Sequence, residues 1–212
     1  MTENSSQDDM GKVIAELEQK CIEMPQSVPV HHHLGLVYRQ VGRLDDAIRE
    51  LEKTVEIDPL SVACLVNLGS MYFDRGETDK AQAVNERALK IAPETAQAHA
   101  NLGLICQQRG EIDKAIEHYT QATITDPKLA TGWINLTTAQ LMGGNYDQAI
   151  NAGRQAVALD PNLAMAQNNL AVALYYKEDY KTAKQHADTA ARLGYAVDPR
   201  FIDALNKGLA AS

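Results

Sequence analysis

The sequence predicts an all-α protein built as a stack of helical hairpins. Landmark residues recur every 34 positions along most of the 212-residue chain. Turn glycines, small alanines and helix-ending prolines all follow this period: Gly42, Gly76, Gly110 and Gly144; Ala47, Ala81, Ala115, Ala149 and Ala183; Pro25, Pro59, Pro93, Pro127 and Pro161. Self-similarity at a fixed period of this length indicates an α-solenoid, in which each repeat packs only on its neighbours.

Each full repeat is predicted to hold two helices, which we call the A helix and the B helix. The A helix precedes the turn glycine, and the B helix runs from the turn to the proline. Proline ends the B helix because its ring cannot continue a helix and disfavours helical backbone in the residue before it. An aspartate recurs near the start of the B helix, where a carboxylate suits the positive end of the helix dipole: Asp45, Asp79, Asp113 and Asp147.

The period divides the chain into segments. We expect a polar tail, disordered or docked, over residues 1–9 and an N-terminal capping helix, equivalent to half a repeat, over residues 10–27. Five full repeats follow at 28–61, 62–95, 96–129, 130–163 and 164–197. In the fifth, Glu178 replaces the turn glycine and Tyr195 replaces the proline. A C-terminal capping helix is predicted over residues 198–212, where four apolar side chains share one face: Phe201, Ile202, Leu205 and Leu209.

Composition and motifs exclude several classes of function. The net charge of −8 argues against nucleic acid as a partner, because phosphate binding needs clustered lysine and arginine. No apolar run approaches the length of a bilayer span, and the N-terminus lacks a signal peptide, so we expect a cytoplasmic protein without membrane insertion. Cys21, Cys64 and Cys106 show no metal-ligand spacing and are predicted to be buried, reduced thiols. No catalytic motif is present, so the sequence predicts no enzyme, no cofactor and no metal.

Three adjacent histidines, His31, His32 and His33, invite a metal interpretation. Consecutive side chains on a helix diverge by about 100°, so the three cannot close on one ion. We expect His31 in the core, His32 at its flank and His33 on the opposite face of the helix.

The repeats resemble the tetratricopeptide repeat, a helical hairpin with small, aromatic and proline residues at set positions. The third repeat carries the pattern residues Leu102, Gly103, Ala115, Tyr119, Ala122 and Pro127, and the first carries Leu34, Gly35, Tyr38, Ala47, Leu51 and Pro59. This resemblance implies a right-handed superhelix whose A helices line a concave groove, with no catalytic machinery.

Residues at position 6 of each repeat are predicted to face the groove. With position 4 in the core, a rotation of about 100° per residue points position 6 to the opposite side. Four of the five residues there are asparagine: His33, Asn67, Asn101, Asn135 and Asn169. A carboxamide offers one acceptor and a donor group to a peptide backbone. In this respect the chain resembles tetratricopeptide proteins that hold extended peptides on a ladder of asparagines.

Specificity is predicted to come from flanking positions of the same helices: Arg39, Phe73, Asp74, Gln107, Gln108, Thr138, Met142, Tyr175 and Tyr176. The sequence therefore predicts a non-catalytic adaptor that binds an extended segment of a partner protein. Two alternatives stay open, namely a scaffold that assembles with itself through its caps or groove, and a regulatory subunit of an enzyme complex. For the asparagines, the alternative is that their amides bond only water and neighbouring helices.

Overall fold

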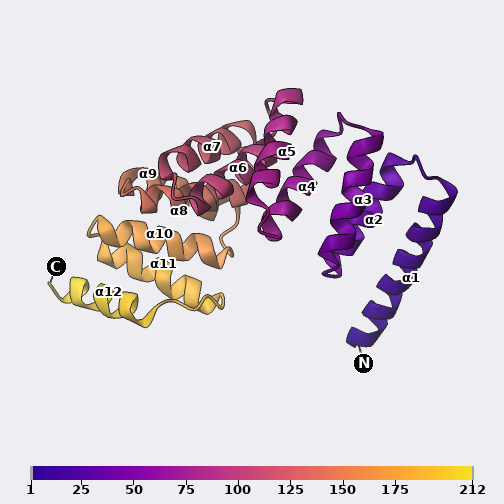
Figure 1. Cartoon of the computed structure of the whole chain (residues 1–212). Helices are drawn as coiled ribbons and strands as arrows, with labels where there is room; N and C mark the ends of the chain where they lie inside the picture. Colours follow the sequence, from indigo (N-terminus) through magenta and orange to yellow (C-terminus); the bar gives the residue numbers. More distant parts are fainter. Residues whose placement is uncertain (1, 212) are drawn as a thin grey trace. The chain divides into compact units, whose positions relative to one another are not determined.

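The computed structural model describes residues 2–211, with side chains from residue 10 onward. Over these residues the chain forms twelve α-helices and no strand (Figure 1). It divides into two compact units, Met1–Asn101 and Leu102–Ser212, and helix α6 (Ala96–Gln108) spans the division. The predicted all-α solenoid of helical hairpins is confirmed.

In the first unit each helix packs on the next along the chain, from α1 to α5. The A helices of the first two repeats are α2 and α4, and their B helices are α3 and α5. The bounds are α1 (Thr2–Glu23), α2 (Val28–Gln40), α3 (Leu44–Ile57), α4 (Val62–Asp74) and α5 (Thr78–Ile91).

The second unit continues the alternation, and α7 to α12 again pack in chain order. Its A helices are α8 and α10, and its B helices are α7, α9 and α11. The bounds are α7 (Ile112–Thr125), α8 (Ala130–Met142), α9 (Tyr146–Leu159), α10 (Ala164–Tyr176), α11 (Tyr180–Arg192) and α12 (Pro199–Ala211).

Helix α1 begins at Thr2, so helical backbone runs through most of residues 1–9, for which the sequence predicts a polar tail, disordered or docked. The physical reason is that no proline or glycine precedes Gly11, so nothing in the backbone ends the helix upstream. Whether this segment docks on the rest of the chain concerns side chains outside the described residues.

Helix α1 contacts α2 in the same way as α3 contacts α4. The Tyr38 hydroxyl on α2 donates to Glu18 on α1 at 2.5 Å, and the Tyr72 hydroxyl on α4 donates to Glu52 on α3 at 2.5 Å. Both members of the second pair lie 34 residues after those of the first. Helix α1 thus makes the contact that a B helix makes with the A helix of the next repeat.

The turns between A and B helices share one backbone conformation. The turn glycines at 42, 76, 110 and 144 have φ between 73° and 81°, the left-handed region that glycine adopts without steric cost. At the first turn, the Gly42 N–H bonds the Arg39 carbonyl and the Arg43 N–H bonds the Tyr38 carbonyl, a Schellman motif. In the fifth repeat, Glu178 takes the same conformation with φ 62°.

Close approach of paired helices depends on small residues. A Cβ at Gly103 on α6 would lie 2.5 Å from the Tyr119 ring on α7, so only glycine at position 103 leaves room for this ring. The C-terminal helix uses the same device, because a Cβ at Gly208 would lie 2.6 Å from the Tyr180 ring. Leu205 on α12 is fully buried, so this helix covers the apolar end of the second unit.

Candidate functional site: the A-helix face

The four asparagines at position 6 are partly buried, and three of them are bonded to neighbouring helices. In three of them, Nδ2 donates to the A helix of the preceding repeat. The acceptor is His32 Nε2 for Asn67 (2.9 Å), the Val66 carbonyl for Asn101 (3.2 Å) and Thr138 Oγ1 for Asn169 (2.9 Å). Each of these amides therefore joins two consecutive A helices within one unit.

Asn101 makes a second contact that the sequence did not predict. Its Nδ2 also lies 3.0 Å from Oδ1 of Asn85 on α5, and Asn85 in turn donates to the Ala81 carbonyl at 2.7 Å. Asn85 is fully buried. The only signal was that Asn85 stands where the third repeat has Tyr119, which left a polar group in the core in need of a partner.

The carbonyl oxygens of the asparagine side chains remain without a donor. No described residue donates to Oδ1 of Asn67, Asn101 or Asn169, and Asn135 makes no side-chain hydrogen bond with the described residues. A carboxamide oxygen has two lone pairs and accepts readily from a backbone N–H. The internal bonds hold three amides in place and leave their acceptors available.

The flanking residues of the first unit pair with one another. Arg39 Nη2 on α2 donates to Ser70 Oγ and to Asp74 Oδ2 on α4, both at 2.8 Å. His33 is exposed and Phe73 is half-buried. The two predicted charges on this face therefore neutralise each other across consecutive A helices.

In the second unit two predicted flanking residues make internal hydrogen bonds. Gln107 accepts from the Tyr119 hydroxyl at 3.1 Å, and Thr138 Oγ1 donates to the Ile134 carbonyl at 3.0 Å. Gln108 and Met142 are exposed. In each unit, we call the surface formed by its position-6 residues and these flanking residues the A-helix face of that unit.

The two predicted tyrosines lie in aromatic contacts. Tyr175 packs edge-on against Tyr180 and Phe201, and so belongs to the cluster under α12. Tyr176 stacks on Tyr146 at the start of α9, with ring centroids 4.5 Å apart and an interplanar angle of 7°. Both side chains are therefore held by B-helix or C-terminal partners, which the helical periodicity of α10 alone did not indicate.

Position 4 of the repeats contains a device that sequence reasoning missed. In the first, fourth and fifth repeats the side chain there donates an N–H to the carbonyl of the proline that ends the preceding helix. Trp133 Nε1 reaches Pro127 at 2.9 Å and Gln167 Nε2 reaches Pro161 at 2.8 Å. His31 Nε2 lies 3.2 Å from the Pro25 carbonyl. These bonds satisfy carbonyls that have no partner within the helix they follow.

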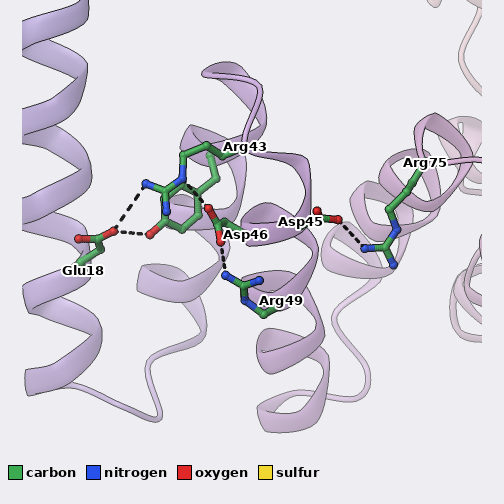
Figure 2. A network of polar contacts seen from close by, with 7 residues as sticks. Glu18, Arg43, Asp45, Asp46, Arg49 and Arg75 are labelled. Atoms are coloured by element: carbon green, nitrogen blue, oxygen red, sulfur yellow. Dashed lines mark hydrogen bonds and ion pairs between the residues drawn. The ribbon is translucent and has the colours of Figure 1, made fainter.

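Ion pairs on the B-helix side lie both within a repeat and between successive repeats (Figure 2). Asp46 on α3 bonds both Arg43, at 2.5 Å, and Arg49. Arg75, after α4, reaches back to Asp45 at 2.9 Å. In the second unit Lys177 makes the equivalent contact with Asp147 at 3.0 Å. Exposed pairs of this kind contribute little to stability, so they mark register between repeats rather than a binding site.

The cysteines differ from the prediction of three buried thiols. Cys64 is buried, but Cys21 and Cys106 are half-buried. Burial raises the pKa of all three thiols, and at Cys21 the charge of Glu50 adds to the effect. Predicted placement is confirmed for the histidines, with His31 buried, His32 intermediate and His33 exposed.

Comparisons with solved structures show the same fold. The Cut9–Hcn1 hetero-tetramer of the APC/C matches with a TM-score of 0.80 and 19% identity over 95% of this chain, which spans 40% of that one. PilF of Pseudomonas aeruginosa matches with a TM-score of 0.75 and 24% identity, covering 85% of this chain and 83% of that one. YrrB, described as a TPR protein with an unusual peptide-binding site, matches with a TM-score of 0.65 and 19% identity, covering 90% and 96%.

Two kinds of sequence comparison give different results, since only the comparison with family models finds a match. A search of curated proteins finds no match. Among the described residues, no helix has the length and apolar character needed to cross a membrane.

Tetratricopeptide-repeat models match residues 26–94, 61–123 and 136–197, most of the length over which the 34-residue period runs. The chain belongs to the tetratricopeptide-repeat family.

Proposed function

We propose that this protein is a non-catalytic adaptor whose A-helix face binds an extended peptide segment of a partner protein. Its family is one of protein–protein interaction scaffolds. The observation that carries the proposal is the row of partly exposed asparagines at one A-helix position, of which Asn67, Asn101 and Asn169 are each oriented by an internal bond while their side-chain carbonyls accept none.

The chemistry suits a peptide main chain. An extended segment presents backbone N–H groups at regular intervals and needs acceptors for them. An amide already fixed by one hydrogen bond loses less side-chain entropy when it makes another, so binding costs less. Each hydrogen bond formed with the peptide backbone contributes about 0.5–1.5 kcal/mol net. A few such contacts in each unit give affinities in the micromolar range once flanking contacts are added.

Asn135 offers the sharpest test, because it makes no internal side-chain hydrogen bond whose loss would disturb the fold. Peptides are first selected on the full chain from a random library, and their affinities are then measured by fluorescence anisotropy. Asn135→Ala is expected to weaken binding about tenfold, equivalent to about 1.4 kcal/mol. Asn151→Ala, at an exposed position of α9, is the matched control.

Loss of affinity in Asn135→Ala and in Asn67→Ala, with the control unchanged, supports the proposal. If both variants bind the selected peptides as tightly as the unaltered chain, the asparagines have no part in binding and the proposal is wrong.

Self-association remains the second candidate, favoured by apolar side chains exposed at the N-terminal helix. Ile22 is 74% exposed, and Met24 is 45% exposed. Light scattering over a concentration series measures the mass of the particle, and a constant monomer mass excludes this candidate. Co-purification from the native source tests the further alternative of a regulatory subunit, which requires an enzyme among the partners.

A further inference from the structure

Three side chains of metal-binding type meet where α1, α2 and α3 pack together in the first unit. They are Cys21 on α1, His31 on α2 and Glu50 on α3. One ligand atom from each residue lies within 4.8 Å of the other two. His31 is buried, while Cys21 and Glu50 are half-buried, so solvent reaches one side of the cluster.

The hydrogen bonds of His31 orient it as metal-binding histidines are oriented. Its Nε2 lies 3.2 Å from the Pro25 carbonyl, which can only accept, so Nε2 carries a proton. Its Nδ1 lies 2.7 Å from Glu50 Oε2. In neutral imidazole this Nδ1 presents a lone pair to a carboxylate, an arrangement that needs a proton or a cation between the two atoms. Histidine ligands commonly donate their other N–H to a backbone carbonyl in this way.

The repeats themselves show that packing does not require this cluster. The residues 34 positions after Cys21, His31 and Glu50 are Val55, Leu65 and Val84, and these three belong to one apolar cluster. The corresponding sets in later repeats each contain an apolar residue or a threonine: Leu89, His99 and His118; Thr123, Trp133 and Ala152; Val157, Gln167 and His186. Only the first junction has a potential ligand at every one of the three positions.

We propose that Cys21 Sγ, His31 Nδ1 and a Glu50 carboxylate oxygen bind a divalent transition-metal ion, with Zn²⁺ the best match. Zinc takes sulfur, nitrogen and oxygen ligands at about 2.0–2.3 Å in tetrahedral geometry, which places ligand atoms about 3.3–3.8 Å apart. The cluster spans this range, from 2.7 Å between His31 and Glu50 to its 4.8 Å limit. Small side-chain rotations therefore suffice, and water takes the fourth position.

Binding displaces protons and fixes α1. The Cys21 thiol gives up its proton to solvent, as does the proton shared by His31 and Glu50 when present. The ion then joins α1 to both helices of the first repeat. Metal occupancy would thus decide how firmly the N-terminal helix covers that repeat.

Variants borrowed from the protein's own repeats test the site without disturbing the fold. Cys21→Val copies Val55, and His31→Gln copies Gln167, whose Nε2 bonds the corresponding proline carbonyl at 2.8 Å. Glu50→Gln removes only the charge. Cys106→Val and His33→Gln are controls that keep the cluster intact. The full chain, reduced and free of metal, is titrated with Zn²⁺ in a calorimeter and with Co²⁺ in a spectrophotometer.

The unaltered chain and both controls should bind one Zn²⁺ and show a thiolate-to-cobalt charge-transfer band with the d–d bands of tetrahedral Co²⁺. Each ligand variant should bind Zn²⁺ at least about 100-fold more weakly, since even residues behind the ligands cost 10–100-fold. Amide exchange over residues 10–23 should slow on adding Zn²⁺ in the unaltered chain and in both controls, and should not change in the three ligand variants. Absence of the charge-transfer band, or equal Zn²⁺ affinity in Cys21→Val and the unaltered chain, would overturn the proposal.

Discussion

Asn101 on α6 donates its side-chain amide to Oδ1 of Asn85 on α5 across 3.0 Å, and Asn85 is fully buried. A residue on the A-helix face is thereby fixed by a polar group in the core of the preceding repeat. This contact connects the stability of the second repeat with the geometry of the proposed binding face.

Replacing Asn85 with alanine should lower the free energy of unfolding by about 1–3 kcal/mol, because it leaves Asn101 without one acceptor and removes a bonded side chain from the core. Thermal unfolding followed by circular dichroism measures the change. Asn151→Ala, on the exposed side of α9, should have almost no effect. Equal melting temperatures for the two variants would contradict the prediction.

A glycine in the turn of the fifth repeat should stabilise the protein. Glu178 has a φ of 62°, a conformation that costs a residue with a Cβ about 1–2 kcal/mol relative to glycine. Glu178→Gly is therefore expected to raise the free energy of unfolding by up to about 1 kcal/mol, after the greater chain entropy of glycine is counted. Chemical denaturation measures it. Gly144→Ala, at a φ of 73°, should shift stability by a similar amount in the opposite direction, and a destabilising Glu178→Gly would refute the argument.

Stability should fall on mild acidification. Burial lowers the pKa of His99 and of His186, and the charge of Arg154 lowers that of His186 further. Their pKa is about 6.5 in the unfolded chain, which therefore binds more protons than the folded chain as the pH falls through that value toward the folded pKa. Melting temperatures should thus decrease from about pH 7.5 to about pH 5.5.

Replacing one of these histidines tests the cause. His186→Gln should reduce the slope of melting temperature against pH, while Asn151→Ala, which replaces an exposed side chain that does not titrate, should leave the slope as it is. An unchanged slope in His186→Gln would show that other groups govern the acid response.

The Arg39–Asp74 pair should set charge preference on the first unit if peptides bind there. Asp74→Asn leaves Arg39 with only Ser70 as a partner, so the face gains a positive charge. The affinity ratio between a glutamate-containing peptide and its glutamine analogue should then rise by up to about fivefold, the range of an exposed ion pair. Asp147→Asn, which breaks the pair with Lys177 in the second unit, is the control. A ratio equal in both variants would place the peptide elsewhere.

Local signals explain how much of this fold was predictable. A proline that cannot continue a helix and a glycine with positive φ, as at Pro127 and Gly110, act within a few residues, so their period determined where helices end. The family pattern then supplied the architecture. Helical periodicity also placed the three adjacent histidines correctly.

Contacts between helices were not predictable in the same way. The pairing of Asn101 with Asn85, the packing of Tyr175 under α12, and the cluster of Cys21 with Glu50 join residues 16 or more positions apart. Their meeting depends on rotamers and on how closely two helices approach. The helical period predicts the direction of each side chain but not its hydrogen-bond partner. It therefore could not predict that the face expected to bind peptides also makes hydrogen bonds within the protein.

The proline carbonyls that follow the B helices show what the repeats hold constant. Imidazole, indole and carboxamide groups reach Pro25, Pro127 and Pro161 from position 4. In the second repeat, where that position is Leu65, the guanidinium of Arg87 approaches the Pro59 carbonyl from a different helix. In each of these repeats the proline carbonyl oxygen accepts a hydrogen bond, whereas the residue that donates it and the helix that carries this residue differ between repeats. Chimeric arrays assembled from these repeats should accordingly be joined by matching each such oxygen with a donor, not by aligning amino-acid types column by column.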